Sequence, residues 1–425
     1  MENKMNILWF SLSPCGSIRR KKIIKYNQGW MISLEDEIKK RQEIKLSVAY
    51  YENTESEDFE YKGVHYYPIS RPFSRTPIER RICRFISQKY LDNRIIPEFI
   101  KIIDKVKPDL IHIHGTEEAF GKIGEYIHNI PIVFSIQGLL APYSYKFFSG
   151  IPQEIIRKYE PLKDKLIKYS YLNDYKVNCY RRERELRYLQ NAKYILGRTF
   201  WDREITQAIN PNRKYYVVNE ILRSPFFNAR WIKTQFSDKI IIVSTISIGI
   251  YKGYETLLEA ANILKKYSNL NFEWQIIGYN KNHKCANIIH KMTRLNPDKC
   301  NIKFLGLKSA EEMADILTKA DIYCHVSHIE NSPNSVCEAM IIGLPIIATF
   351  AGGTASLIEN EKEGKLIQDG DPFILAGAIY DYISNFKMAQ TYGLNARKRA
   401  LARHTPQSVG DELMNAYKEI LKNEL

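Results

Sequence analysis

Two glutamates, Glu330 and Glu338, lie eight positions apart in the segment SHIENSPNSVCEAM. The apolar run 322–326 before them predicts a strand, and Ser335–Ile342 predicts a helix. Glu330 then lies in the connecting loop and Glu338 in the first turns of the helix, so both carboxylates can face one pocket. Such carboxylates act as a general acid and base, or they accept hydrogen bonds from the hydroxyl groups of a ligand.

The predicted helix N-terminus, around Asn334–Val336, lies between the two carboxylates. The first N–H groups of a helix have no partner within the helix and form a natural site for anions. A nucleotide-linked sugar has hydroxyl groups at both ends and a diphosphate in the middle, which matches this order of groups. Two simpler interpretations stay open, because Ser335-x-x-Glu338 also fits a capping box and Glu330 also fits a solvated loop residue.

Lys252 and Gly253 lie in the loop between a predicted strand, Lys239–Thr245, and a predicted helix that begins at Tyr254. A lysine at this edge of the sheet would contact the same diphosphate and stabilise charge on a departing phosphate. Gly29 precedes the first helix of the chain and would let the backbone approach a phosphate. The simpler interpretations are an ordinary exposed lysine and a plain turn.

His325 and His328 come nearest to a metal-ligand pattern. They lie three positions apart, but no further ligand follows at a spacing typical of metal sites, so we expect strand-end residues and no metal. The sequence contains neither G-x-x-x-x-G-K-[ST] nor G-x-G-x-x-G, the fingerprints of P-loop and dinucleotide sites. We therefore expect no cofactor.

The elements that must position these residues alternate between strands and helices. Apolar runs in the first half predict strands at 5–12, 46–51, 64–69, 110–114 and 132–136. Periodicity is lost over 219–238, and the strand Lys239–Thr245 then restarts the alternation. At about 150 residues per domain, a chain of 425 residues allows two or three domains. We predict two α/β domains, 1–225 and 226–405, followed by a terminal helix over 406–425.

The composition predicts a soluble, cytoplasmic protein with anionic partners. The chain has 62 lysines and arginines against 48 acidic residues, a formal net charge of +14. This balance favours nucleic acid, phosphorylated small molecules or an acidic membrane surface. Seven cysteines occur singly and without C-x-x-C, as is typical of reduced thiols in a cytosol. No segment reaches about 18 uninterrupted apolar residues, so we expect no membrane-spanning helix.

The stretch Arg75–Tyr90 predicts an amphipathic, basic helix. Ile78, Ile82, Phe85 and Ile86 recur at helical spacing, and five arginines and lysines surround them. Two interpretations are open. The helix either packs on its own domain or lies at the interface of an anionic membrane.

Taken in their order along the chain, these motifs resemble the family 4 glycosyltransferases of GT-B architecture, retaining enzymes that use nucleotide sugars. The resemblance covers nearly the whole chain and is strongest from Lys239 to about Ala378. It rests on Glu330-x(7)-Glu338, the G-x-P of Gly343–Pro345, Gly352–Gly353, Lys252–Gly253 followed by TLLEAANIL, FLGL at Phe304–Leu307 and ADIY at Ala320–Tyr323. It implies two Rossmann-like domains that face each other across a cleft, with a C-terminal helix that returns to the first domain.

The resemblance also implies roles for single residues. Glu330 would contact hydroxyl groups of the donor sugar, and Glu338 would hold the ribose. Lys252 and Gly29 would contact the diphosphate. The reaction would be a front-face displacement, in which the leaving phosphate oxygen accepts the proton of the acceptor hydroxyl. Lys252 and the helix N-terminus would take the role of a divalent metal. The amides that would contact sugar and phosphate belong to Asn331, Ser332, Asn334 and Ser335.

Three departures from the family pattern change these expectations. The chain has Ile246 and Ser247 where the family often has an arginine, and we expect Arg198 to meet the diphosphate charge instead, unless it is an exposed structural arginine. Gln137 stands where many members carry a histidine, so it would hydrogen-bond the sugar without acting as a base. Ser356 stands where a glutamate is common.

The sequence therefore predicts a retaining, metal-independent glycosyltransferase. Its donor would be a nucleotide sugar and its acceptor a saccharide, free or lipid-linked. Its place would be the assembly of a bacterial capsule, O-antigen or exopolysaccharide, at the inner face of the plasma membrane and on an anionic surface. One alternative is a nucleotide-sugar epimerase of the same fold. The other is a non-catalytic nucleic-acid-binding protein, which is disfavoured because the basic residues are dispersed and no RNA-binding signature is present.

Overall fold

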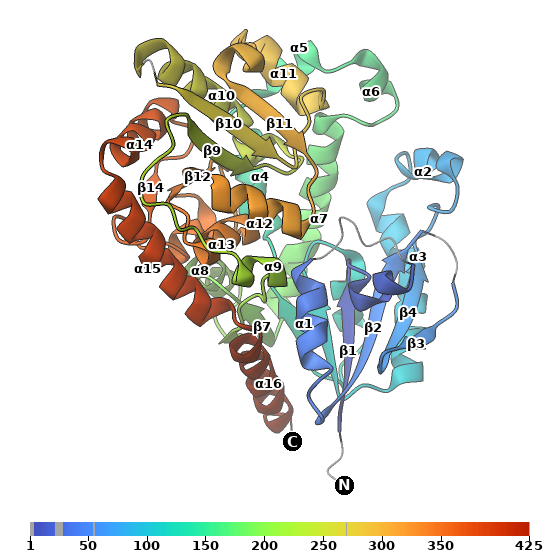
Figure 1. The fold of residues 1–425 in the computed structure, drawn as a ribbon. Helices are drawn as coiled ribbons and strands as arrows, with labels where there is room; N and C mark the ends of the chain where they lie inside the picture. The colour runs from blue at the N-terminus through green and yellow to red at the C-terminus, as the bar shows by residue number, and fades with distance from the viewer. Residues whose placement is uncertain (1–3, 22–28, 54–55, 269, 425) are drawn as a thin grey trace. The chain divides into compact units, whose positions relative to one another are not determined.

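The computed structural model describes residues 4–21, 29–53, 56–268 and 270–424 (Figure 1). The chain divides into two compact units. The first contains Met1–Ser144, Pro161–Ile221 and Thr405–Leu425, and the second contains Tyr145–Glu160 and Leu222–His404. Each unit is an α/β structure built on a mainly parallel sheet, which confirms the predicted fold class. Residues 22–28, in the expected loop before Gly29, lie outside the described residues.

The sheet of the first unit has eight strands in the order β3-β4-β2-β1-β5-β6-β7-β8. All paired neighbours are parallel except β3 and β4, which form a hairpin. Its two turn residues, Lys62 and Gly63, both have positive φ, as a type I′ turn requires. The strands are β1 (Met5–Ser11), β2 (Ile44–Glu52), β3 (Phe59–Tyr61), β4 (Val64–Ser70), β5 (Leu110–His114), β6 (Ile132–Ser135), β7 (Tyr194–Gly197) and β8 (Lys214–Val217).

Helices cover both faces of this sheet, and successive residues of β1 therefore enter two different cores. Ile7 and Trp9 belong to one core cluster, whereas Leu8 and Phe10 belong to the other. This follows from the alternation of side chains along a strand. It also explains why the central strands read as continuous apolar runs. The helices are α1 (Trp30–Ile38), α2 (Pro77–Cys83), α3 (Gln88–Val106), α4 (Leu140–Lys146), α6 (Leu162–Leu166), α7 (Tyr171–Asn191), α8 (Phe200–Ile209) and α16 (Pro406–Lys422).

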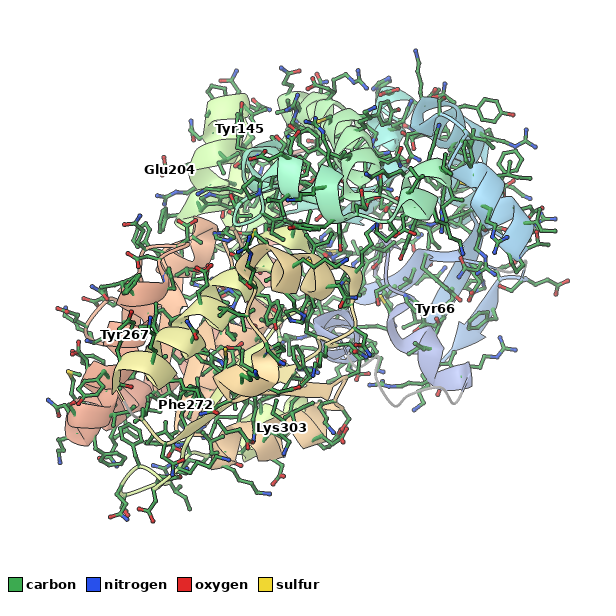
Figure 2. The ribbon with its side chains drawn as sticks, turned by 90° about the horizontal axis from the view of Figure 1, so that it is seen from above. Tyr66, Tyr145, Glu204, Tyr267, Phe272 and Lys303 are labelled. Carbon is green, nitrogen blue, oxygen red and sulfur yellow. The ribbon has the colours of Figure 1, made fainter. Side chains whose placement is uncertain are left out.

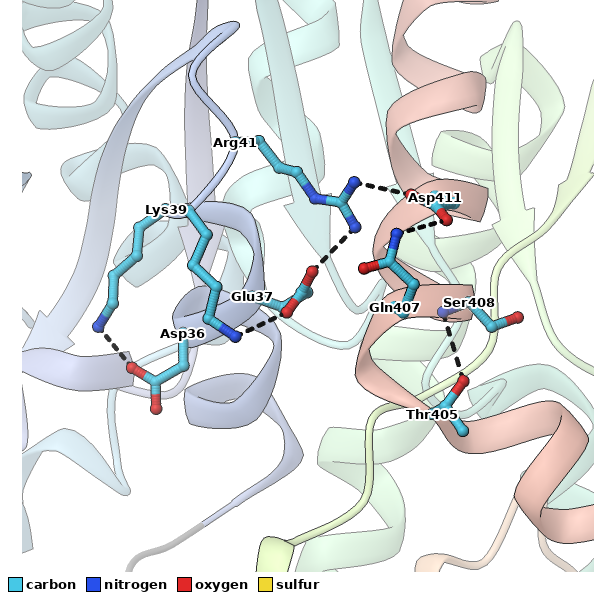
Figure 3. Close-up of polar contacts among 9 residues, drawn as sticks. Asp36, Glu37, Lys39, Arg41, Thr405, Gln407, Ser408 and Asp411 are labelled. Atoms are coloured by element: carbon cyan, nitrogen blue, oxygen red, sulfur yellow. Dashed lines mark hydrogen bonds and ion pairs between the residues drawn. The ribbon is translucent and has the colours of Figure 1, made fainter.

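The last helix, α16, is part of the first unit, as the predicted return of the C-terminal helix requires. It begins after Thr405, whose hydroxyl accepts a hydrogen bond from the N–H of Ser408. Arg41 joins it to α1, because its guanidinium donates to both Asp411 (2.7 Å) and Glu37 (2.8 Å) (Figure 3). The apolar face of α16 packs into the core cluster that contains Trp9.

The sheet of the second unit has six parallel strands in the order β11-β10-β9-β12-β13-β14. Phe272, labelled in Figure 2, begins β10 and is buried. The strands are β9 (Ile240–Thr245), β10 (Phe272–Ile277), β11 (Ile302–Gly306), β12 (Ile322–His325), β13 (Ile346–Thr349) and β14 (Lys365–Ile367). The helices are α5 (Gln153–Tyr159), α9 (Ser224–Asn228), α10 (Tyr254–Ile263), α11 (Lys284–Thr293), α12 (Ala310–Lys319), α13 (Asn334–Ile342), α14 (Pro372–Ser384) and α15 (Phe386–His404).

Residues 145–160 belong to the second unit, although the chain returns to the first unit immediately afterwards. Helix α5 packs on α11, and the buried carboxylate of Glu160 forms an ion pair with Lys284 at 2.8 Å. Lys146 forms a second ion pair with Asp369 at 3.2 Å. The segment therefore packs in the second unit, whereas its neighbours in the sequence pack in the first.

The prediction of a single helix over Arg75–Tyr90 is wrong, because the chain forms two helices there, α2 and the start of α3. Ser87 has an extended backbone, and its hydroxyl accepts a hydrogen bond from the N–H of Tyr90, which starts the second helix. Helix α3 then runs through Pro97 to Val106. Among the residues that the structure describes, none of the helices combines the length and the apolar character needed to cross a membrane.

Candidate functional site

The two glutamates of the sequence motif lie at the carboxyl edge of the second sheet, on the loop between β12 and α13 and on α13 itself. Helix α13 begins after Pro333, and this N-cap residue makes no side-chain hydrogen bond to the helix. The capping box that Ser335 and Glu338 could have formed is therefore absent from this part of the structure. The start of a helix is favourable for anions, because its first N–H groups point out of the helix and its dipole is positive there.

Glu330 lies beside Lys252. The lysine ammonium donates to Glu330 Oε1 at 2.5 Å, the Ser327 hydroxyl donates to the same oxygen at 3.0 Å, and His325 Nε2 lies 4.0 Å from it. Burial raises the pKa of the Glu330 carboxyl, but the Lys252 charge and the hydrogen bonds from Lys252 and Ser327 outweigh that effect and leave the pKa below its usual value. Glu330 is therefore a carboxylate that accepts hydrogen bonds, and it is not a proton donor. It is also not the solvated loop residue of the simpler interpretation.

Two glycines let other loops approach the Glu330 loop closely. Gly253 has a φ of 74°, and a Cβ there would lie 1.9 Å from the Val326 carbonyl oxygen. Gly352 has a φ of 56°, and a Cβ there would lie 2.0 Å from the Glu330 carbonyl oxygen. The N–H of Gly353 donates to that same carbonyl at 2.9 Å. The Lys252–Gly253 and Gly352–Gly353 motifs thus hold the segment Val326–Glu330 from two sides.

Glu338 is paired with Arg223, a residue that the sequence analysis did not single out. Arg223 Nε and a terminal guanidinium nitrogen each donate to one carboxylate oxygen of Glu338, both at 2.7 Å. Burial raises the pKa of Glu338 in spite of this partner. Arg223 lies just before Pro225 in a stretch without periodicity, so no spacing signal marks it. Each carboxylate oxygen keeps a lone pair for a further hydrogen bond.

The remaining predicted residues of the second unit surround the start of α13. Asn331 is buried, whereas Ser332, Asn334 and Ser335 are half-buried. Asn334 Oδ1 is buried and, within the described structure, has no hydrogen-bond partner. An unpaired oxygen at a helix N-terminus is a group that a ligand hydroxyl can satisfy.

His325 and His328 have different surroundings. Burial lowers the pKa of His325 to about 4, so its ring is neutral. His328 Nε2 lies 2.7 Å from Glu255 and its Nδ1 lies 3.2 Å from Asp369. Burial lowers the pKa of His328, but the two carboxylates outweigh it and raise the pKa above its usual value. His328 thus bridges two carboxylates, and Lys146 contacts one of them.

Three predicted residues belong to the first unit. Gly29 precedes α1 with an extended backbone that any residue adopts, and a Cβ there would meet nothing within 4 Å. Arg198 is buried, which excludes an exposed structural arginine. Its guanidinium stacks on Trp30, the residue after Gly29, at 4.4 Å, and it lies 3.6 Å from Glu220. The structure thus brings Arg198 to the start of α1.

Gln137 is half-buried between the end of β6 and the start of α4. Glu185 accepts hydrogen bonds from the Thr116 hydroxyl (2.6 Å) and from the N–H of Ala141 (3.0 Å), and so ties the loop after β5 to the start of α4. Burial raises the pKa of Glu185 to about 7. Sequence analysis missed Glu185 because it lies on the charged helix α7, among arginines.

Comparison with known proteins places this geometry in context. Residues 226–399 match the family model described as "Glycosyl transferases group 1". The chain is 27% identical over 198 residues to the amylovoran biosynthesis glycosyltransferase AmsK of Erwinia amylovora. This alignment covers 45% of this chain and 47% of that protein. It is 20% identical over 366 residues to the capsular polysaccharide biosynthesis glycosyltransferase CapM of Staphylococcus aureus, which covers 81% of this chain and 84% of that one.

Solved structures share the fold over the whole chain. Sucrose-phosphate synthase from Thermosynechococcus elongatus aligns with a TM-score of 0.72 at 15% identity and covers 99% of this chain and 100% of that one. Anabaena Alr3699/HepE in complex with UDP and glucose aligns with a TM-score of 0.65 at 16% identity and covers 97% and 99%. These neighbours are GT-B proteins, which confirms the predicted GT-B fold.

Proposed function

Residues 226–399 form a glycosyl transferases group 1 region within a GT-B fold, and on this basis we propose that the protein is a retaining glycosyltransferase that moves a sugar from a nucleotide sugar to a saccharide acceptor. The acceptor is lipid-linked, and the product belongs to a bacterial surface polysaccharide. Relatives whose names state amylovoran and capsular polysaccharide biosynthesis support the last point.

One observation carries the proposal. The segment Val326–Glu330 is held between the two glycine motifs, and this fixes the Glu330 carboxylate 2.5 Å from the Lys252 ammonium, on the loop that leads into the uncapped α13 N-terminus. A cation, a helix N-terminus and a carboxylate then lie within one short stretch of the sheet edge. This set matches the diphosphate and the hydroxyl groups of a nucleotide sugar.

In the proposed reaction, Lys252 and the α13 N-terminus bind the diphosphate, and no metal is required. The bond between the anomeric carbon and the phosphate oxygen breaks as charge develops on that oxygen. The acceptor hydroxyl forms the new bond on the same face and passes its proton to the departing oxygen. Lys252 stabilises the developing charge, because a positioned cation in a buried site acts more strongly than one in water.

Glu330 and Glu338 orient the donor in this proposal. Glu330 Oε1 is used by Lys252 and Ser327, so its second oxygen accepts a hydroxyl of the sugar. Glu338 accepts the ribose hydroxyls with the lone pairs that Arg223 leaves. Arg223 is a positioning residue, since it contacts the carboxylate and not the donor. Gly29, Gln137 and Arg198 are proposed to contribute from the first unit.

A panel of nucleotide sugars tests the proposal by thermal shift, beginning with UDP-sugars because HepE was solved with UDP and glucose. A donor at about 100 times its Kd stabilises the folded protein by about 2.7 kcal/mol. We expect one donor to shift the wild type and to shift Glu330→Gln much less. Glu311→Gln, an exposed glutamate on α12, serves as the matched control. No shift with any donor would exclude the donor site.

Product analysis then distinguishes transfer from the epimerase alternative, which the matched glycosyltransferases do not favour. A transferase forms a glycosylated product only with an acceptor present, and the anomeric configuration of that product reports retention. An epimerised nucleotide sugar formed without acceptor would contradict the proposal. We expect the transferase activity to survive chelation of divalent metal ions. Loss of activity with the chelator would contradict a reaction that needs no metal.

A further inference from the structure

Two short helices of the first unit, α2 and α6, bury none of their residues. A helix inside a globular unit is normally stabilised by an apolar face that packs on the core. Helix α2 is instead fixed locally by a complete capping box, in which Thr76 and Glu79 bond each other's N–H groups. The fold of the first unit therefore gives these helices no core to cover.

The two helices lie next to each other. The Arg84 guanidinium, just after α2, stacks on the Tyr169 ring at 4.7 Å, and the Lys168 ammonium, just after α6, lies 4.8 Å from the Phe85 ring. Residues 75–90 and 162–169 thus form one surface, which we call the α2–α6 surface. Figure 1 shows both helices at the upper right of the ribbon.

This surface exposes large apolar side chains. Each of them is between 37% and 70% exposed, and most are aliphatic. Single exposed apolar residues are common on proteins, but such a concentration on two neighbouring helices and the residues that follow them marks an interaction site. The side chains are Ile78, Ile82, Phe85, Tyr90, Leu162, Leu166, Ile167 and Tyr169.

The same surface is strongly basic. Residues 75–90 and 162–169 contain eight lysines and arginines and two acidic residues, whereas the whole chain has 62 against 48. One of the two acidic residues, Glu79, is engaged in the capping box. The basic residues are Arg75, Arg80, Arg81, Arg84, Lys89, Lys163, Lys165 and Lys168.

We propose that the α2–α6 surface docks the protein on an anionic lipid membrane. A membrane interface accepts both features at once, because apolar side chains enter the headgroup boundary while lysines and arginines meet lipid phosphates. Nucleic acid would match the charge, but it binds exposed aromatic rings rather than isoleucines and leucines. The inference rests on the proposed function for its biological meaning, since a lipid-linked acceptor is held in a membrane.

Vesicle sedimentation of the full chain tests the proposal. We expect retention on phosphatidylcholine vesicles that contain phosphatidylglycerol, little retention on phosphatidylcholine alone, and weaker retention at about 1 M salt than at about 0.01 M, where charges are screened far less. The Arg80→Ala/Arg81→Ala variant should bind about 30-fold more weakly, since each basic residue near an anionic surface contributes about fivefold. Ile82→Ser/Leu166→Ser should also weaken binding.

Lys45→Ala/Lys101→Ala, which removes two exposed lysines elsewhere in the first unit, is the matched control and should bind as the wild type does. Equal weakening in this control, or wild-type binding by both α2–α6 variants, would overturn the proposal. So would binding of the wild type to mixed-sequence RNA that the α2–α6 variants lose, without binding to vesicles.

The donor-induced thermal shift separates this inference from the proposed function. The α2–α6 variants should keep the full shift, because Lys252 and Glu330 lie in the other unit. A full donor shift without vesicle retention overturns only the membrane surface. Vesicle retention that depends on the α2–α6 surface, without a shift from any donor, supports the surface and overturns the proposed function.

Discussion

Arg223 donates two hydrogen bonds of 2.7 Å to Glu338, one to each carboxylate oxygen. The arginine reaches α13 from the start of α9, and it also stacks on Phe226 at 4.9 Å. Only 3% of the Glu338 side chain and 19% of the Arg223 side chain are exposed. The second glutamate of the motif is therefore held in a fixed orientation before any ligand binds.

Removal of this arginine should destabilise the second unit. Arg223→Met leaves the Glu338 carboxyl buried without its charge partner, and such a change costs about 3–5 kcal/mol of unfolding free energy. Chemical denaturation followed by circular dichroism measures the loss. Lys319→Met, which breaks an exposed ion pair with Asp315, should change stability by less than about 1 kcal/mol. The double variant Arg223→Met/Glu338→Gln should recover most of the loss, and a single variant as stable as the wild type would contradict the pairing.

Lys252 should matter for turnover as well as for folding, because Lys252→Met also leaves the Glu330 carboxylate without its ion-pair partner. Lys252→Met removes the cation that is proposed to stabilise the leaving phosphate, and a loss on the order of 10²–10³ in kcat is expected. Steady-state kinetics with the donor identified by thermal shift measures the effect. Lys281→Met is the control, since Lys281 is an exposed lysine of the same unit, paired with Asp298. An unchanged kcat in Lys252→Met would remove Lys252 from the mechanism.

Gly352→Ala should destabilise the protein by more than the conformational cost of an alanine at positive φ, because the new Cβ collides with the Glu330 loop. A Cβ at position 352 meets the Glu330 carbonyl oxygen at 2.0 Å, whereas a Cβ at Gly306 meets nothing within 4 Å. Both glycines have positive φ, so Gly306→Ala carries the conformational cost alone, about 1–2 kcal/mol. We expect Gly352→Ala to lose about 1–3 kcal/mol more and to lose donor binding as well. Equal melting temperatures for the two variants would refute the close approach.

Glu185 should make stability depend on pH. Its pKa is raised by burial from 4.5 to about 7, so between these values the folded state holds a proton that the unfolded state has released. Stability therefore falls as pH rises from 4.5 to about 7, by about 3 kcal/mol for this group. Glu185→Gln should be more stable than the wild type at about pH 8 and not at about pH 4. Glu183→Gln, an exposed neighbour on α7, should show no such difference.

Strands were the most predictable part of the chain, because parallel strands covered on both faces read as apolar runs. The Glu330 and Glu338 positions followed from the strand–loop–helix order. Arg223 did not, since it lies in a stretch without periodicity and its partner is 115 positions away. The break between α2 and α3 depends on a local hydroxyl bond at Ser87 that competes with an unbroken helical pattern. The close approach of Gly352 to Glu330 is a tertiary contact, which spacing does not encode.

The segment 145–160 has a consequence for how the protein can be taken apart or recombined. The backbone crosses from one unit to the other four times, after Ser144, Glu160, Ile221 and His404. A single cut therefore separates no complete unit. A fragment that begins at Leu222 lacks Glu160 and Lys146, the partners of Lys284 and Asp369. A chimera that takes the second unit from a relative must therefore exchange two separate stretches of sequence, and it must keep the last helix with the first unit.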